Sequence, residues 1–222
     1  MREERIFSID PATAKDLDDA LSVKTNEDGT YDIGVHIADV SFFVKPNTAL
    51  DRDARKRATS VYLVQRVVPM LPPALSEQLC SLNPGEDRLA FSVIFTVNKD
   101  AKILKKWFGK TIIRSAAKLA YQDAQNVIEG KGLGNVNIGG NHTGSAVEED
   151  VRLLWSLAKQ LRETRFKNGA LSSESLKLKF QLDEAGLPHD CSEQERMDSN
   201  FLIEEVRACL GAFSAHITNM GV

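Results

Sequence analysis

Residues 9–21 read IDPATAKDLDDAL and place four aspartates within ten positions: Asp10, Asp16, Asp18 and Asp19. A single cation, Lys15, lies among them. Carboxylates a few ångströms apart repel one another, so such a cluster requires either full solvation or a cation between its members. The stretch therefore predicts either a solvated acidic turn or a metal site.

The residues between the aspartates help to weigh these two interpretations. They are largely apolar: Ile9, Ala12, Ala14, Leu17, Ala20 and Leu21. This pattern indicates a partly buried segment, where unpaired carboxylates are costly, so we favour the metal site. Oxygen ligands without a neighbouring His or Cys indicate magnesium or manganese rather than zinc. A calcium EF-hand loop is excluded because Ala20 and Leu21 stand where its Asp or Asn and its Gly belong.

The bulk composition limits the class of protein. The chain has 222 residues, 42% of them hydrophobic, which is enough for the core of one large or two small domains. Its net charge of −3 provides no general attraction to nucleic acid or to an acidic membrane. Three cysteines outside any CxxC pattern argue against a disulfide framework and a zinc site. Since no signal peptide or membrane span is recognisable, we expect an intracellular, soluble protein.

The periodicity of apolar residues predicts a mixed α/β chain without internal repeats. Three β-hairpins are expected: around Asp28-Gly29, around residues 98–102 and within residues 176–188. Helices are expected over residues 48–59, 72–82, 118–130 and 147–161, and from Met197 onward.

Residues 130–146 read GKGLGNVNIGGNHTGSA and contain six glycines without apolar periodicity. This composition predicts a loop or insertion. It is not a phosphate-binding loop, because the GxxxxGK[ST] pattern is absent. The apolar stripe that follows is typical of an amphipathic helix, in which Trp155 faces the core.

The chemistry of the acidic cluster favours a phosphorylated substrate. A carboxylate-bound magnesium ion without a nearby nucleophilic Ser or Cys is typical of phosphoryl transfer, so a nucleic acid is a candidate substrate. Two basic stretches are compatible with RNA: the RKR triplet at 55–57, and six cations with no acid between Asp100 and Asp123. A solvated surface explains such runs equally well. Tyr62 and Tyr121 lie near these stretches and are candidates for base stacking, with core packing as the alternative.

Six segments of the chain resemble one family in their order and spacing: IDPATAKDLDDALSV, IGVHIADVS, RATSVYLVQRVVPMLP, SLNPGEDRLAFSV, TIIRSAAKLAYQDAQ and SNFLIEE. They look like the RNB catalytic domain of RNase II-type exoribonucleases, over nearly all of residues 5–205. The amino-acid sequence of these segments is most similar to the eukaryotic cytoplasmic branch, which acts without the exosome and prefers RNA with 3′ uridine tails. The resemblance implies a mixed α/β fold, with a twisted mixed sheet surrounded by helices. It also implies processive, magnesium-dependent hydrolysis of RNA from the 3′ end to nucleoside 5′-monophosphates.

The resemblance also implies roles for individual residues. Asp10 and Asp19 look like the principal metal ligands, Asp16 like a supporting ligand, and Asp18 like the catalytic carboxylate whose loss abolishes cleavage. Tyr62 resembles the aromatic residue that grips the terminal nucleotides and sets the size of the final product.

Further positions match the family in part. Tyr121 and Phe180 resemble positions that contact bases, and one of Glu204 or Glu205 is expected to touch the RNA. His36 belongs to the VHIADVS motif, and we expect it to pack or to form hydrogen bonds rather than to act in catalysis. The expected partner is single-stranded RNA with a free 3′ end, uridylated in some substrates, bound by a cytoplasmic monomer without a membrane.

Two departures from the family pattern lead us to expect a C-terminally incomplete RNB domain over residues 1–205 and a non-family tail over 206–222. The family's flanking RNA-binding barrels, and its later segment that supplies an arginine and a glutamate, do not fit in 222 residues. After Glu205 the chain reads VRACLGAF where the family continues with a different apolar helix. We therefore expect weak RNA capture, and a catalytically inactive metal- and RNA-binding fragment is the alternative to an active enzyme.

Overall fold

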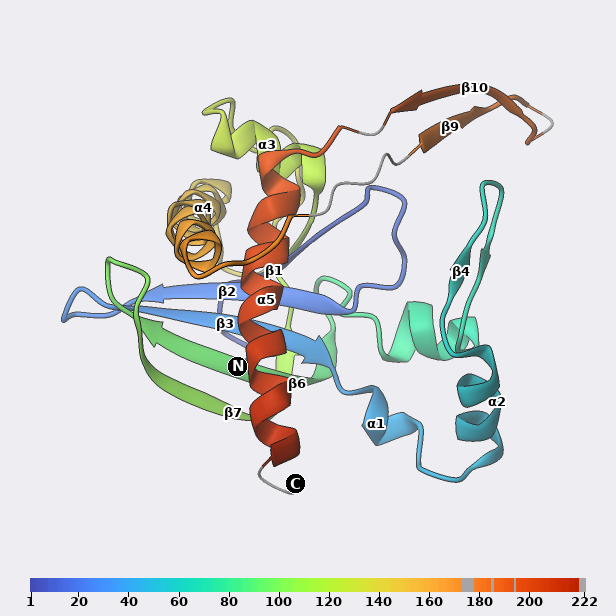
Figure 1. Cartoon of the computed structure of the whole chain (residues 1–222), viewed down its shortest axis with the longest axis horizontal. Coiled ribbons are helices and arrows are strands. Elements are labelled where there is room, and N and C mark those ends of the chain that lie inside the picture. Colours follow the sequence, from blue (N-terminus) through green and yellow to red (C-terminus); the bar gives the residue numbers. More distant parts are fainter. Residues whose placement is uncertain (173–177, 185, 194, 220–222) are drawn as a thin grey trace.

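A six-stranded mixed sheet forms the centre of the molecule (Figure 1). The computed structural model describes residues 1–172, 178–184, 186–193 and 195–219. The strands lie in the order β7-β6-β3-β2-β1-β8. They are β1 Ile6–Asp10, β2 Asp19–Thr25, β3 Tyr31–Ala38, β6 Asp87–Val97, β7 Ile103–Arg114 and β8 Ala117–Ala120. Only the β1–β8 pair among them is parallel, so the mixed sheet that the sequence predicted is confirmed.

The two hairpins of this sheet form where the turn signals predicted them. Residues 26–30 join β2 to β3, and Gly29 adopts a φ of 78° there, a conformation that costs glycine little. Residues 98–102 join β6 to β7, and the side chain of Asn98 accepts hydrogen bonds from the backbone of Asp100 and Lys102. Asn26 and Asn98 each also form a backbone hydrogen bond that closes the turn.

Two smaller hairpins project from the same side of the molecule (Figure 1). One consists of β4 Val61–Tyr62 and β5 Val67–Val68, whose side chains are exposed. The other consists of β9 Leu178–Leu182 and β10 Pro188–Glu193, in agreement with the hairpin expected within residues 176–188. Residues 176, 177 and 185 of that expectation lie outside the described residues.

The helices differ from the sequence expectation mainly at their ends. They are α1 Val40–Phe43, α2 Ala49–Arg57, the short π-helical turn η1 Ala74–Leu79, α3 Tyr121–Ile128, α4 Gly144–Lys167 and α5 Asp198–Asn219. The expected start of α3 at Lys118 was wrong, because Lys118 belongs to β8 and pairs with Ser8 of β1. In the described part of the chain, no helix is long and apolar enough to cross a membrane.

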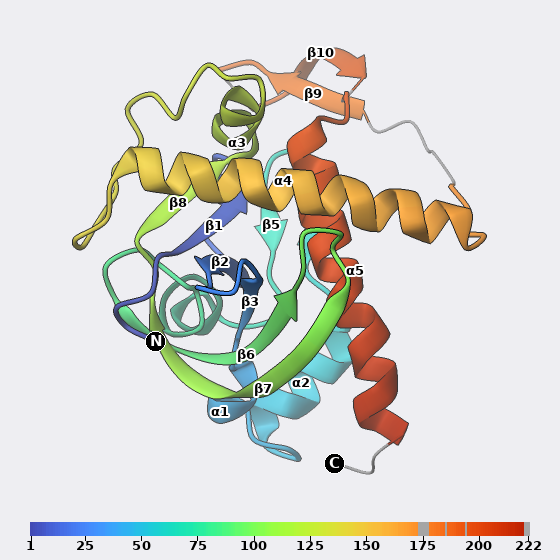
Figure 2. The same ribbon diagram turned by 90° about the vertical axis from the view of Figure 1, so that its left-hand side faces the viewer.

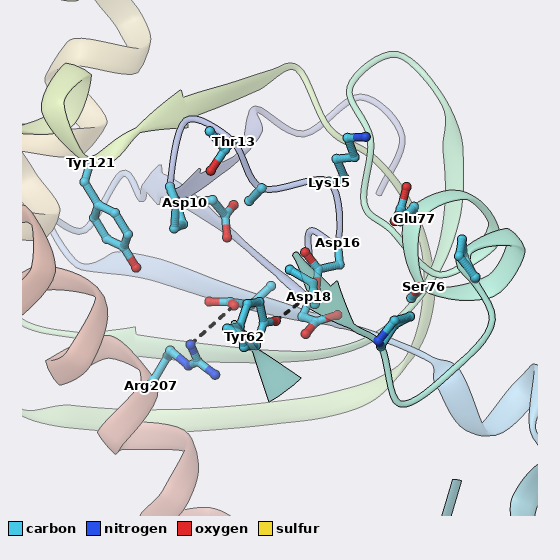
Figure 3. Close-up of a pocket in the computed structure, with 16 residues that line it drawn as sticks. Asp10, Thr13, Lys15, Asp16, Asp18, Tyr62, Ser76, Glu77, Tyr121 and Arg207 are labelled. Atoms are coloured by element: carbon cyan, nitrogen blue, oxygen red, sulfur yellow. Dashed lines mark hydrogen bonds and ion pairs between the residues drawn. The ribbon is translucent and has the colours of Figure 1, made fainter. Parts of the chain in front are cut away.

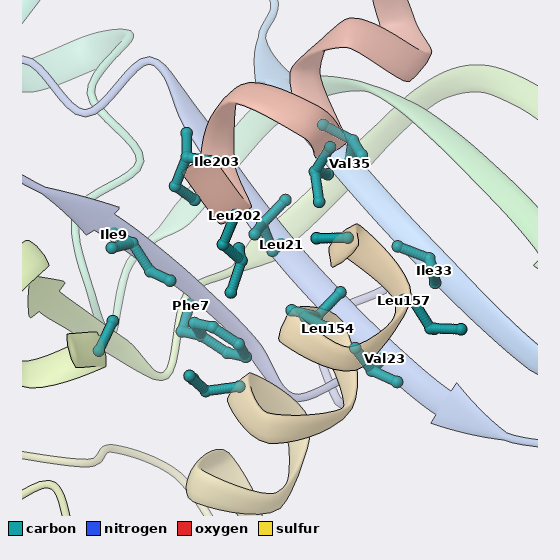
Figure 4. Close-up of a cluster of buried hydrophobic side chains, with 14 of the residues drawn as sticks. Phe7, Ile9, Leu21, Val23, Ile33, Val35, Leu154, Leu157, Leu202 and Ile203 are labelled. Atoms are coloured by element: carbon teal, nitrogen blue, oxygen red, sulfur yellow. The ribbon is translucent and has the colours of Figure 1, made fainter. Parts of the chain in front are cut away.

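Apolar clusters pack on both faces of the sheet, as its alternating side chains require, while edge strand β7 is largely exposed. On one face, Phe7 and Leu21 pack with residues of α3, α4 and α5, including Leu154 and Leu202 (Figures 2 and 4). On the other face, Ile6 packs in a second cluster with the following residues: Leu17, Ala20, Ala38, Cys80, Leu82, Ala90 and Ile113. Leu17 is the member of this second cluster that matters for the site, because it lies between Asp16 and Asp18.

Buried ion pairs attach the helices to one another and to the sheet. Glu205 of α5 is buried and accepts hydrogen bonds from Arg165 of α4 at 3.0 and 2.5 Å. Arg5, just before β1, pairs in the same two-pronged way with buried Asp150 of α4. A buried carboxylate is tolerated only when it is paired, so these contacts fix the direction of α4 and α5 over the sheet.

We expect Leu154→Ala to lower the free energy of unfolding by about 2 to 5 kcal/mol, because it leaves a cavity between α4 and the sheet. Leu187→Ala is the matched control, since Leu187 is exposed in the turn before β10 and its loss should change stability by less than about 0.5 kcal/mol. Urea unfolding of both variants measures the difference. Equal effects of the two substitutions would contradict this description of the core.

Candidate active site

A pocket of about 570 Å³ opens at the ends of β1 and β2 (Figure 3). The loop 11–18, the β4–β5 hairpin, η1, the start of α3 and the third turn of α5 complete its wall. The lining side chains that matter below are Asp10, Lys15, Asp16, Asp18, Asp19, Tyr62, Glu77, Tyr121 and Arg207. All four aspartates of the acidic cluster therefore face one cavity.

The backbone turns at Leu17, and this turn brings the aspartates together. Leu17 is only 1% exposed. Its N–H donates to the Ser81 hydroxyl at 3.0 Å, and its carbonyl accepts from the Leu82 N–H at 2.9 Å. With Leu17 held inward, the neighbouring residues Asp16 and Asp18 both line the pocket. This turn lets all four carboxylates line the same pocket.

Lys118 of β8 holds the first half of this loop. Its ammonium donates to the carbonyls of Ala12 and Ala14 at 3.1 and 2.6 Å. Its charge also opposes the rise in the pKa of Asp10. Lys118 belongs to the basic stretch between Asp100 and Asp123, so one member of that stretch serves the acidic loop directly.

A second distant cation, Arg207 of α5, reaches the pocket. Its Nη1 lies 3.7 Å from Oδ1 of Asp19. Lys15 is the only cation within residues 9–21, so the local sequence did not indicate that Lys118 and Arg207 approach the aspartates. The helical period does predict the side of α5 on which Arg207 lies. Arg207 follows buried Ile203 by four residues, and residues four apart share one side of a helix.

Burial makes the carboxylates of this pocket hard to ionise. It raises the pKa of Asp10 to about 6, with Asp18 and Asp19 adding repulsion. Burial likewise raises the pKa values of Asp18 and Asp19, and Arg207 opposes the rise in both. Oδ2 of Asp10 is buried without a hydrogen-bond partner. Such atoms are rare in folded proteins, and a bound ion is one of their ordinary explanations.

The donor chemistry of the pocket fits a hard divalent cation. Carboxylate oxygens are the ligands that magnesium and manganese prefer, and the unpaired oxygen of Asp10 is available. Within the described residues, however, no group of three or more His, Cys, Asp or Glu side chains already converges on one ion position. The pocket therefore has suitable oxygen donors, but they are not drawn together around one point.

The aromatic candidates fall into two groups. Tyr62 is 68% exposed, and its hydroxyl donates to Oδ2 of Asp16 at 3.1 Å. Tyr121 also lines the pocket, where burial and then the charges of Asp10 and Asp19 raise its pKa. Phe180 lies outside the pocket lining, on β9, and is 41% exposed. Figure 3 shows Tyr121 on the side of Asp10 and Tyr62 close to Asp16 and Asp18.

The remaining candidates lie away from the pocket. His36 is fully buried between the hydroxyls of Ser22 and Ser92, at 3.0 and 2.7 Å, and burial lowers its pKa to about 4. Glu205 is buried in its ion pair with α4. Glu204 is exposed and pairs with Arg196.

Four cations of the basic stretches pair with acids of the protein itself. Lys110 contacts Asp39 at 3.0 Å, and Arg114 contacts Asp87 at 2.7 Å. In the RKR triplet, Arg55 and Arg57 each pair with an aspartate four residues earlier on α2. These contacts favour the interpretation of the stretches as protein surface.

Comparison with known sequences identifies the family. The chain matches the RNB domain over residues 1–219. It belongs to the RNB family of 3′-to-5′ exoribonucleases. DIS3-like exonuclease 2 of Schizosaccharomyces pombe is 53% identical over 209 residues, which cover 92% of this chain and 22% of that protein. Two Arabidopsis thaliana proteins, DIS3-like exonuclease 2 and inactive exonuclease DIS3L2, are each 48% identical over 92% of this chain and 20% of their own length.

Solved structures share the fold. RNase R of Mycoplasma genitalium, in complex with ribose-methylated single-stranded RNA, has a TM-score of 0.82 and 26% identity over 93% of this chain and 31% of that one. Yeast Ssd1, described as a pseudonuclease, has a TM-score of 0.65 and 21% identity over 92% of this chain and 23% of that one. The RNB fold that the resemblance implied is therefore confirmed.

The matches differ in how much of each protein they cover. This chain spans only about a fifth to a quarter of the length of its curated relatives, 20% to 27%. The family match spans residues 1–219, and α5 runs through Glu205 without a break. Arg207 therefore lies within the matched region.

We expect Asp10→Asn to stabilise the metal-free protein near neutral pH. The folded-state pKa of Asp10, about 6, lies above the ordinary value of 3.8, so ionisation destabilises the fold as the pH rises through that range. After allowance for solvent screening, the gain should be about 1 kcal/mol. Unfolding in urea with a chelator measures it.

The pH dependence provides the control. The gain should vanish below the ordinary pKa of aspartate, where the wild-type carboxyl is neutral in both states. Asp28→Asn should have the opposite sign, because bonds to Thr30 lower the pKa of exposed Asp28. A destabilised Asp10→Asn near neutral pH would contradict the assigned burial of this carboxyl.

Proposed function

We propose that this chain provides the acidic active site of a magnesium-dependent 3′-to-5′ exoribonuclease. Its products would be nucleoside 5′-monophosphates. The observation that supports this most directly is the pocket itself, where four aspartates and an unpaired buried oxygen of Asp10 lie beside exposed Tyr62. Manganese is expected to replace magnesium, because both prefer oxygen ligands.

The four aspartates and two tyrosines that line the pocket each have a role in this proposal. Asp10 and Asp19 would hold the cation, with Asp16 in support. Asp18 is the catalytic carboxylate, and its charge is needed where the attacking water meets the phosphate. A bound magnesium ion supplies the acidity of that water and offsets charge on the phosphate. Tyr62 and Tyr121 would stack on the 3′-terminal bases, since both line the pocket.

The biological setting belongs to the same proposal. We propose action in the cytoplasm, on messenger RNA and on RNA with 3′ uridine tails, as the resemblance of the sequence segments to the family's cytoplasmic branch implies. The RNase R complex with single-stranded RNA supports single-stranded RNA as the substrate. We propose a monomer that Phe180 helps to place on RNA, although Phe180 lies outside the pocket lining. Comparing cleavage of uridine-tailed and adenosine-tailed RNA tests the tail preference.

A second function is a fragment that binds metal and RNA without cleaving. Two observations favour it: the described residues contain no preformed three-ligand cluster, and two similar proteins are described as inactive or as a pseudonuclease. A single-stranded RNA labelled within its 3′ uridine tail, incubated with magnesium, separates the two. Release of mononucleotides indicates the enzyme, whereas retention of intact RNA indicates the binding fragment.

Asp18→Asn should keep RNA binding and lose hydrolysis by several orders of magnitude, because the amide preserves shape but removes the charge. Single-turnover cleavage and RNA affinity are measured side by side. Asp53→Asn removes an equivalent carboxylate from the exposed face of α2 and should leave both values unchanged. Near-normal cleavage by Asp18→Asn would end its assignment as the catalytic carboxylate.

The double variant Asp10→Asn with Asp19→Asn should abolish binding of magnesium and manganese, since it removes both principal ligands. Titration calorimetry with manganese measures this binding without any need for activity. Asp28→Asn with Asp53→Asn is the matched control, because it removes two exposed carboxylates far from the loop 11–18 in sequence. Unchanged binding by the first double variant would refute the ligand assignment.

Tyr62→Ala should change the size of the smallest product while leaving the free energy of unfolding nearly unchanged, because Tyr62 is 68% exposed. Gel separation of products and urea unfolding test the two halves of this expectation. A product ladder like that of the wild type, combined with a loss of several kcal/mol in stability, would instead show a structural tyrosine.

A further inference from the structure

Arg207 is placed where a divalent cation would compete with it. It projects from α5 into the pocket, and Figure 3 marks its contact with Asp19 by a dashed line. Its side chain is 58% exposed, whereas that of Asp19 is 12% exposed. The buried partner of this pair is therefore the carboxylate, and the exposed partner is the cation.

The contact with Asp19 is loose in comparison with the other arginines of this region. Arg165 donates two hydrogen bonds to Glu205. Arg162 also contacts Glu205, and its guanidinium lies 4.1 Å from the centre of the Phe201 ring. Within the described part of the chain, Arg207 contacts Asp19 at 3.7 Å, which is too long for a hydrogen bond. Rotation of its exposed side chain can break this contact without disturbing α5.

Asp19 cannot pair with Arg207 and bind a divalent ion equally well at the same time. The pair with Arg207 reduces the cost of an ionised, mostly buried carboxylate when no metal is bound. A divalent ion on the same carboxylate would stand within a few ångströms of the guanidinium, in a pocket where water screens charge poorly. The like charges repel, so occupation of Asp19 by the ion requires Arg207 to withdraw.

We infer that Arg207 is the counter-ion of the metal-free pocket and competes with the divalent cation for Asp19. This inference rests on the proposed function, in which Asp19 is a metal ligand. It has two consequences for the same site. The chain keeps its acidic pocket folded before metal is bound, and the affinity for metal is lower than the carboxylates alone would give.

The test is titration calorimetry with manganese on four proteins: the wild type, Arg207→Met, Arg207→Lys and Arg152→Met. Methionine keeps the length and helix preference of the side chain but removes its charge. Arg207→Met should bind manganese roughly five- to tenfold more tightly, at the low end of the coupling between two ligands of one protein. Arg207→Lys keeps the charge and should stay within about twofold of the wild type. Arg152→Met removes the same charge from the surface pair with Glu148 and should have no effect.

Each outcome decides a separate point. If the wild type binds manganese and Arg207→Met binds it no more tightly, the competition is refuted while the metal site stands. If no protein binds manganese, the proposed metal site fails and the inference fails with it. An equal gain in Arg152→Met would show a general charge effect and would also overturn the inference. Circular dichroism of Arg207→Met should show the same helical signal as the wild type. This control shows that a missing gain in affinity does not come from unfolding of the variant.

Discussion

The burial of Leu17 is the constraint on which the acidic site depends. This side chain is anchored in the core on one face of the sheet, and its backbone is bonded to Ser81 and Leu82. The chain must therefore turn between Asp16 and Asp18, and both carboxylates are left at the pocket. The free energy of apolar burial thus opposes the mutual repulsion of the aspartates. A cluster of like charges can persist here because the residues between those charges contribute to the core.

The helical layer contributes to the site as well as to the core. Glu205 ties α5 to α4 through Arg165, and Ile203 and Val206 bury the same helix against the sheet. These contacts set the rotation of α5 about its own axis. Arg207 is thereby directed at Asp19, and a change in the packing of α5 would alter the charge balance of the pocket. Core packing and site electrostatics are coupled through this one helix.

Membership of the RNB family does not by itself establish activity, which depends on the residues that this chain has in its pocket. Its similar proteins include DIS3-like exonuclease 2 and a protein described as an inactive exonuclease. The fold is also shared by yeast Ssd1, described as a pseudonuclease. A fold can therefore persist when catalysis does not. What separates these cases in physical terms is whether carboxylates in the right positions can share a cation. In this chain all four candidates face one pocket, and one of their oxygens is buried without a partner.

The sequence by itself determined the features that depend on local patterns. The hairpins at Gly29 and at residues 98–102, a helix over residues 147–161, the start of α5 near Met197 and the acidic loop follow from turn chemistry and periodicity, although α4 extends beyond that range at both ends. The family and its fold could also be recognised from short motifs. At Lys118 the sequence placed a residue in the wrong element, because strand pairing with β1 outweighed the helical pattern there. It also predicted a full helix over residues 72–82, where the structure has only the short π-helical turn η1, and it missed α1.

Only the tertiary structure decided which distant charges meet. Lys118 and Arg207 lie about a hundred and two hundred residues from the aspartates, yet both approach them. Likewise, Tyr62 lies at the pocket and Phe180 outside its lining, although both matched the family by sequence. The physical reason is that contacts between strands and helices depend on packing direction, which no local pattern encodes. Residue types and their spacing specify the chemistry of the aspartate loop, whereas the packing of β8 and α5 specifies the cations that surround it.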